Sequence, residues 1–353
     1  MSRVLRLAII ASARFPIREP FAGGLEAHTW SLAQELRRRG HRVTVFAGPG
    51  SDPALDVREL GSVPVISDQA RSDVSMSSES WLNEHHAYLE LMLSLAGSQE
   101  FDLVHNNSLH YLPVAMASSV PQPVVTTLHT PPTPWLESAI AAPARCPVTF
   151  VAVSEHTARA WRHRVPESTV VHNGIDLRAW PLGPGDGPLV WTGRMVPEKG
   201  PALAVRAARL AGVPLRLAGP IGDRTYFDDE VRPLLGGEIQ YVGHLGQRQL
   251  AELVGRARAS LVTPCWEEPY GLVVAESLAC GTPVCGFDRG ALAELVTERC
   301  ARLVPADDVE ALAAAIGEVR MLSRLDARAH AERTCSLSTM VDRYEHLFRE
   351  LIS

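Results

Sequence analysis

The sequence lacks the features of several protein classes. None of its six cysteines stands in a Cys-x-x-Cys pair, and their spacing is not that of a disulfide-rich secreted domain, which favours a reducing compartment. No apolar run approaches the roughly 18 residues of a membrane-spanning helix. The apolar run near the N-terminus is only about as long as a buried parallel strand, so we interpret it as a strand rather than a signal peptide. We therefore expect a cytoplasmic protein whose membrane association is at most peripheral.

The chain also lacks an excess of positive charge. It has 34 basic and 40 acidic side chains, for a net charge of −6. A general nucleic-acid-binding protein needs a basic surface, so no nucleic-acid partner is predicted. No Asp-x-Asp pair occurs, and the neighbouring His85 and His86 have no companion ligands. We therefore predict neither a metal site nor a cofactor such as pyridoxal phosphate.

What the sequence does contain is two runs of alternating strands and helices. A chain of 353 residues exceeds what one hydrophobic core usually supports, so two domains are expected. A segment dense in proline and glycine, residues 181–188, separates the two runs. Strand–helix–strand units imply parallel sheets covered by helices. The prediction is an α/β protein with Rossmann-like domains at residues 1–182 and 183–335, followed by an amphipathic helix in residues 336–353.

Residues 264–286 combine two carboxylates with a glycine-opened helix. Tyr270 and Gly271 begin the predicted helix, and Gly281 ends it. Glu268 lies just before the helix and Glu276 lies inside it. Free N–H groups in the first turn form an anion site, and Gly271 lets a phosphate approach the backbone. A carboxylate beside that site can accept hydrogen bonds from sugar or ribose hydroxyls. The alternative is two ordinary solvated glutamates.

A second candidate anion site lies between residues 193 and 200. Arg194 and Lys199 flank the start of a predicted helix, with Gly193 before them. A planar guanidinium and a mobile ammonium beside a helix start can neutralise a leaving diphosphate. The alternative interpretation is a solvated loop with two surface cations.

The first domain offers polar residues at the ends of its predicted strands. His105 and Asn106 follow one strand, and His129 follows the next. Ligands of open α/β sheets bind at the carboxyl ends of the strands, so these tips should line one crevice. The loop of residues 14–21 adds Arg14 and Arg18 to its mouth. We predict that four residues contact the acceptor, the second substrate that would enter this crevice: Arg14, Arg18, His105 and Asn106.

The sequence from Glu268 onward resembles the signature of retaining GT-B glycosyltransferases, particularly family GT4. Glu268 and Glu276 are separated by seven residues, and a Gly-x-Pro-Val strand follows. The family has a similar glycine pair after its first strand, here Gly23 and Gly24, and a similar Gly-Arg…Lys-Gly segment. The Thr-Leu-His-Thr sequence around His129 and the Asn-Gly-Ile-Asp turn at residues 173–176 are also similar to segments of the family. The resemblance covers nearly the whole chain.

The resemblance implies a GT-B architecture, in which two facing Rossmann-like domains enclose a cleft and the C-terminal helix crosses back to the first domain. It implies that the turn at residues 241–245 binds the nucleobase. His129, Glu268, Arg194 and Lys199 take the catalytic positions. The implied donor-binding residues are Gly23, Gly24, Gly193, Arg194, Lys199, His244, Leu245, Glu268, Tyr270, Gly271, Leu272 and Glu276.

The implied reaction moves a sugar from a nucleoside diphosphate sugar to an acceptor hydroxyl, with retention at the anomeric carbon and without a metal. The acceptor is unknown and could be a sugar, a lipid-linked molecule or a natural product. Two other functions stay open. One is a nucleotide-sugar epimerase or hydrolase of the same fold, and the other is a nucleotide-sugar-binding protein without catalysis.

Overall fold

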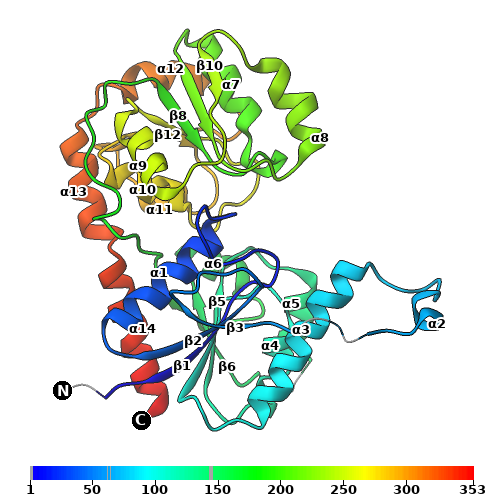
Figure 1. The fold of residues 1–353 in the computed structure, drawn as a ribbon. Coiled ribbons are helices and arrows are strands. Elements are labelled where there is room, and N and C mark those ends of the chain that lie inside the picture. Colours follow the sequence, from blue (N-terminus) through cyan, green and yellow to red (C-terminus); the bar gives the residue numbers. More distant parts are fainter. Residues whose placement is uncertain (1–2, 62, 64, 143–145) are drawn as a thin grey trace.

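The computed structural model describes residues 3–61, 63, 65–142 and 146–353. The chain forms two lobes, each built on a parallel β-sheet with helices packed on it (Figure 1). Every pair of neighbouring strands in both sheets is parallel. The predicted α/β class with two facing Rossmann-like domains is therefore confirmed.

The N-terminal lobe contains a seven-stranded sheet in the order β3-β2-β1-β4-β5-β6-β7. Its central strands are almost wholly buried because helices cover both faces. The strands are β1 Arg6–Ile10, β2 Arg42–Ala47, β3 Asp56–Glu59, β4 Leu103–Asn106, β5 Val124–Leu128, β6 Val148–Ala152 and β7 Thr169–Val170. The helices are α1 Gly24–Arg38, α2 Asp68–Arg71, α3 Glu79–Ala96, α4 Leu112–Ala115, α5 Pro134–Ala141 and α6 Glu155–Trp161.

The C-terminal lobe contains a six-stranded sheet in the order β10-β9-β8-β11-β12-β13. The strands are β8 Leu189–Thr192, β9 Leu215–Ala218, β10 Ile239–Tyr241, β11 Ser260–Val262, β12 Val284–Phe287 and β13 Ala301–Val304. The helices are α7 Pro201–Leu210, α8 Arg224–Tyr226, α9 Gln247–Arg256, α10 Leu272–Ala279, α11 Leu292–Leu295, α12 Val309–Val319 and α13 Arg324–Thr334.

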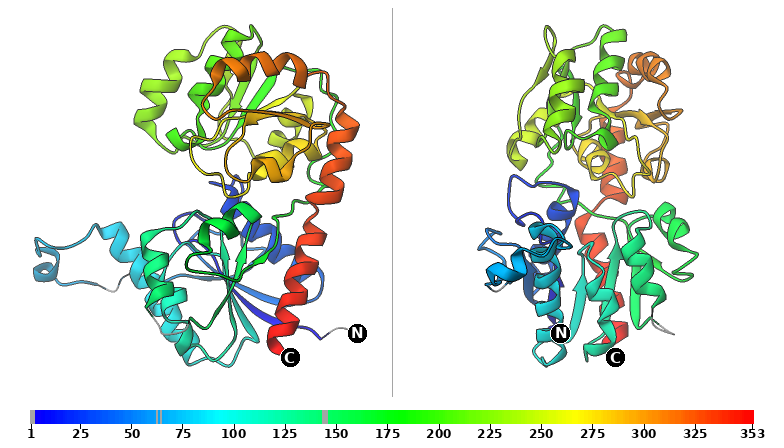
Figure 2. Two further views of the ribbon diagram at one scale, coloured as in Figure 1. Left: turned by 180° about the vertical axis from the view of Figure 1, so that it is seen from behind. Right: turned by 90° about the vertical axis from the view of Figure 1, so that its right-hand side faces the viewer.

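The last helix, α14 Leu337–Ile352, returns to the N-terminal lobe. Figure 2 shows it running along that lobe directly after α13, which lies on the C-terminal lobe. Tyr344 and Phe348 are fully buried in the N-terminal core, and the Tyr344 hydroxyl forms a 3.0 Å hydrogen bond with Thr127 Oγ1. Burying one such aromatic side chain stabilises the fold by about 2–3 kcal/mol. The end of the chain thus fastens the two lobes together.

Within the described residues, no helix has the length and apolar character needed to cross a membrane. The longest helix, α3, carries three glutamates among its 18 residues.

Candidate active site

A cavity of about 420 Å³ lies between the lobes. Loops that follow the carboxyl ends of strands in both sheets form its walls, which is where open α/β sheets bind ligands. Most of the predicted site residues line it: Arg14, Gly23, Gly24, His129, Gly193, Arg194, Lys199, His244, Leu245, Glu268, Tyr270, Gly271, Leu272 and Glu276.

The structure does not bring Arg18, His105 or Asn106 to the cavity wall. Arg18 is exposed on the loop after β1. His105 is fully buried: its Nε2 forms a 2.8 Å hydrogen bond with Thr127 Oγ1, and its ring lies 4.9 Å from that of Tyr344. Side chains alternate between the two faces of a strand, and His105 takes the face covered by α14. His105 is therefore not exposed to the cavity in this structure, and acceptor contacts of Arg18, His105 and Asn106 stay a prediction.

Two helix N-termini point at the cavity from opposite lobes. α1 begins at Gly24 and α10 at Leu272, immediately after Gly271. A Cβ on Gly24 would lie 3.1 Å from Leu272 Cδ1, so the lobes meet closely at this point. Gly271 has φ +99°, a conformation that side-chain-bearing residues rarely adopt. First-turn N–H groups without a partner among the described residues, and the positive ends of two helix dipoles, converge here, which favours an anion.

Lys199 and Glu268 form an ion pair at the cavity wall. Lys199 Nζ lies 2.5 Å from Glu268 Oε2, and the indole N–H of Trp266 donates to the same oxygen at 3.0 Å. The ammonium also lies 4.9 Å from the centre of the Trp266 ring, within cation–π range. Lys199 is the only lysine in the sequence. A chain that otherwise uses arginine thus places its single mobile ammonium in this cleft.

Arg194 leaves the end of β8 and reaches across the cleft toward the N-terminal lobe. A Cβ on Gly23 would lie 4.0 Å from its Nε, so the guanidinium approaches the loop before α1 in the other lobe. Its own-lobe partner, Glu198, is 3.8 Å away, and more than a third of the Arg194 side chain remains exposed. Burial raises the pKa of Glu26 in the first turn of α1, and Arg194 acts on it in the opposite direction. The guanidinium is open to a ligand in the cavity.

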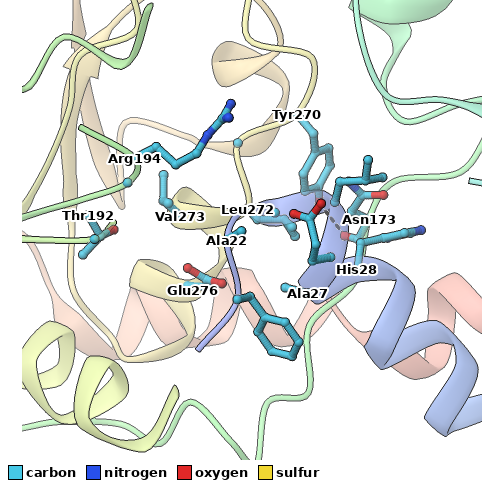
Figure 3. A pocket seen from close by; sticks show the side chains of 18 of the residues that line it. Ala22, Ala27, His28, Asn173, Thr192, Arg194, Tyr270, Leu272, Val273 and Glu276 are labelled. Atoms are coloured by element: carbon cyan, nitrogen blue, oxygen red, sulfur yellow. Dashed lines mark hydrogen bonds between the residues drawn. The ribbon is translucent and has the colours of Figure 1, made fainter. Parts of the chain in front are cut away.

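Glu276 projects into the cavity from the second turn of α10. Figure 3 shows it on the same side as Arg194 and Thr192, with His28 and Asn173 across from them. Burial raises the pKa of its carboxyl to about 7. The group is therefore divided between its neutral and charged forms near pH 7, and hydrogen bonds from a ribose diol would favour the charged form.

His129 lies on the N-terminal side of the cavity in a network of neutral polar groups. Its Nε2 is 2.9 Å from Asn107 Oδ1, and its ring is 4.9 Å from that of His28. Burial lowers the pKa of His129 well below its usual value and that of His28 to about 4. With Asn107 Oδ1 as the acceptor, His129 Nε2 donates the hydrogen bond and Nδ1 is left as an acceptor. His129 can hydrogen-bond a sugar hydroxyl without adding charge.

Several cavity residues were not predicted from the sequence. His28 stands one turn after Gly24 on α1, a spacing that places both on one face of the helix. Neither of its ring nitrogens has a hydrogen-bond partner among the described residues. Asn173 Oδ1 is also unpartnered there, while its carbonyl accepts from the Tyr270 hydroxyl at 2.6 Å. Both residues therefore have polar atoms at the wall of the cavity that a ligand can use. The resemblance of the Asn-Gly turn to the family could have identified Asn173 from the sequence.

The lobes exchange capping contacts around the cavity. Glu19 of the N-terminal lobe accepts a 3.1 Å hydrogen bond from the backbone N–H of Gln247, the first residue of α9. In the opposite direction, Glu294 accepts bonds of 2.8 and 2.6 Å from the backbone N–H groups of Glu155 and His156, which open α6. His244 Nε2 also bonds the carbonyl of Phe21 at 3.0 Å. Each lobe therefore holds a helix start of the other.

Two family models together match most of the chain. Residues 22–179 match Glycosyltransferase Family 4, and residues 187–320 match Glycosyl transferases group 1. The chain belongs to glycosyltransferase family GT4. The GT4 chain is therefore a glycosyltransferase that uses nucleotide sugars, and each matched segment lies within one lobe.

Curated relatives and solved structures agree with this assignment. The GT4 chain is 28% identical over 355 residues to the glycogen synthase of Mycobacterium tuberculosis, covering 88% of this chain and 84% of the relative. It is 26% identical over 342 residues to a phosphatidyl-myo-inositol mannosyltransferase of Mycolicibacterium smegmatis, with the same two coverages.

Two solved structures share the fold over nearly their whole length. Sucrose-phosphate synthase from Thermosynechococcus elongatus superposes with a TM-score of 0.79 at 20% identity, covering 98% of this chain and 99% of the other. Anabaena Alr3699/HepE in complex with UDP and glucose superposes with a TM-score of 0.76 at 18% identity, covering 98% and 100%. At these identities the likeness concerns the fold.

Proposed function

We propose that this GT4 glycosyltransferase transfers a hexose from a nucleoside diphosphate sugar to an acceptor hydroxyl with retention and without a metal. The observation that carries the proposal is the convergence of Arg194, Lys199 and two helix N-termini on one cavity. This arrangement can neutralise a leaving diphosphate with protein groups alone. UDP and UDP-glucose in complexes of a structural neighbour support a donor of this class.

The proposed roles follow the position of each group. Arg194 and Lys199 bind the diphosphate, and Glu276 accepts hydrogen bonds from the ribose hydroxyls. Glu268 and His129 hydrogen-bond the transferred sugar from opposite lobes. Closure of the lobes around the donor excludes water, which strengthens these contacts and suppresses hydrolysis.

In the proposed step, the acceptor oxygen attacks the anomeric carbon on the face from which the diphosphate leaves. The bond between the anomeric carbon and the phosphate oxygen breaks, and a bond to the acceptor oxygen forms. The acceptor proton passes to the departing phosphate oxygen, so no carboxylate nucleophile of the glycosidase type is needed. The neutral state of His129 suits this step because the residue positions a hydroxyl and does not compete for the proton.

The test uses the purified protein with UDP-glucose and other nucleotide sugars. Transfer should continue in excess EDTA, and proton NMR of the product should show the anomeric configuration of the donor. Loss of activity in EDTA with rescue by Mg²⁺, or an inverted product, would contradict the proposal. Rapid donor turnover without any acceptor would instead favour the hydrolase or epimerase, and tight donor binding with no turnover would favour a binding protein.

A further inference from the structure

Among the exposed large apolar side chains of the N-terminal lobe, Phe15 and Leu109 line the cavity. Phe15 follows β1, Leu109 follows β4 and Trp135 follows β5, and these three strands are neighbours in the sheet. Trp81 lies at the start of α3. Figure 1 shows α3, α4 and α5 gathered on one flank of this lobe. Together with two rings between the tryptophans, they form what we call the acceptor rim: Phe15, Trp81, His85, Leu109, Tyr111 and Trp135.

Four rings of the acceptor rim form two stacked pairs joined by a tilted contact. The centroids of Trp81 and His85 lie 4.9 Å apart with planes 10° from parallel, and those of Tyr111 and Trp135 lie 5.3 Å apart with planes at 24°. His85 and Tyr111 join the two pairs at 6.0 Å. Trp81 is 39% exposed and Trp135 is 59% exposed, although large aromatic side chains usually lie inside. The stack fixes two exposed indoles in place before any ligand arrives.

The acceptor rim is continuous with the active-site cavity. Phe15 and Leu109 belong to both, and Arg14 lines the cavity between them. Arg14 is held by Glu84 of α3, with Nε 3.1 Å from Oε1, one residue before His85. A molecule whose reactive end lies in the cavity beside His129 can therefore extend onto the rim.

The two helices that carry the tryptophans of the acceptor rim offer no lysine or arginine to an anionic partner. α3 carries Glu79, Glu84 and Glu90 with no lysine or arginine, and α5 carries Glu137 with no basic residue. Glu84 is paired with Arg14 and Glu137 with His163. An anionic lipid surface or a polyphosphorylated acceptor would find no cluster of basic residues on α3 or α5, and such ligands are bound by clusters of this kind. Indole rings offer an apolar face together with an N–H donor at the edge. Sugar rings match this chemistry, because they combine apolar C–H faces with hydroxyl edges.

We propose that the acceptor is a neutral oligosaccharide, and that its units beyond the glycosylated one stack on the acceptor rim at Trp81 and Trp135. This inference rests on the proposed function, because the rim serves a sugar-accepting cavity. It adds an extended subsite and the substrate class that the subsite takes.

The experiment compares Trp81→Ala, Trp135→Ala and the double variant with Leu210→Ala. Leu210 is 63% exposed at the end of α7 in the other lobe, so it matches the loss of an exposed apolar side chain away from the site. The probes are maltooligosaccharides and α-mannooligosaccharides of one to six units. Binding is followed by saturation-transfer NMR and transfer by KM with UDP-glucose and GDP-mannose. Affinity for UDP and GDP is measured separately by calorimetry.

In the wild type and Leu210→Ala, affinity should rise with chain length for at least one series. In Trp135→Ala, chains of four or more units should bind about tenfold more weakly, while the monosaccharide and the nucleotide bind as before. Binding that ignores chain length, binding of neither series, or tryptophan variants indistinguishable from Leu210→Ala would overturn the inference. Tryptophan-dependent sedimentation with phosphatidylglycerol vesicles would overturn it in favour of a membrane. Failure to bind any nucleotide would instead count against the proposed function.

Discussion

The ion pair between Lys199 and Glu268 leads to a prediction that separates the free enzyme from the donor complex. The two side chains are 24% and 11% exposed, so water screens the pair only in part. At their 2.5 Å separation and an effective dielectric constant of about 20, the Coulomb attraction is on the order of 6–7 kcal/mol before desolvation. Desolvation offsets most of this, and a coupling energy of about 1–3 kcal/mol remains.

The assay is a double-mutant cycle on the free energy of unfolding in urea. It uses the wild type, Lys199→Met, Glu268→Gln and the double variant, and it is repeated with saturating UDP. If Lys199 turns to the diphosphate when UDP binds, its coupling to Glu268 should fall below about 0.5 kcal/mol in the complex. The Arg256–Asp186 pair, whose side chains are both 55% exposed, is the control and should couple by less than about 1 kcal/mol in both states.

Two results would refute this reasoning. A coupling between Lys199 and Glu268 no larger than that of the control pair would mean that the ion pair contributes nothing to the free protein. A coupling that UDP leaves unchanged would mean that Lys199 does not exchange partners. In that case the diphosphate must be neutralised by Arg194 and the helix N-termini without it.

Three further predictions concern single groups in the cleft. The Glu276 pKa of about 7 means that between pH 4.5 and 7 the folded protein holds a proton that the unfolded chain has lost, so the free energy of unfolding should fall as pH rises through this window. The KM for the donor should rise as pH falls below 7, because the neutral carboxyl accepts ribose hydrogen bonds less well. A Glu276→Gln variant with the wild-type pH profiles would contradict both expectations. Pyridoxal phosphate followed by borohydride should label Lys199, the only lysine, and the N-terminal amine, and a nucleoside diphosphate should protect only Lys199. Labelling is read from peptide mass spectra. Equal protection of both amines would argue against phosphate binding at Lys199. His129→Ala and Glu268→Gln should lose transfer while calorimetry shows unchanged affinity for the nucleoside diphosphate; parallel loss of nucleotide binding in folded protein would assign them to the nucleotide.

Local sequence signals predicted the helices of the donor site closely. The glycine that opens α10 and the helix after it follow from steric freedom and from apolar spacing, both of which act within a few residues. The structure places Gly281, with φ +70°, just beyond the end of α10, as expected of a glycine that stops a helix.

The first domain shows where local reasoning fails. The polar tip of β4 was identified, but not which of its residues faces the cavity side: Asn107 bonds His129, whereas His105 lies beneath α14. Alternation along a strand fixes which residues share a face, and only packing decides which face is covered. The covering helix comes more than 200 residues later in the chain, so no window around residue 105 contains the information.

The contacts that complete the cavity are of the same long-range kind. Glu19 and Glu294 sit on exposed or half-buried surface and carry no motif of their own, yet each accepts N–H groups at a helix start of the opposite lobe. A carboxylate at a helix N-terminus satisfies orphan donors and complements the dipole. Because the two contacts run in opposite directions across the cleft, they fix the separation of the lobes from both sides. That separation brings Arg194 within reach of Gly23 and sets Gly24 against Leu272. The donor motifs can therefore be read from the sequence one segment at a time, whereas their assembly into one site depends on side chains that only the folded lobes place together.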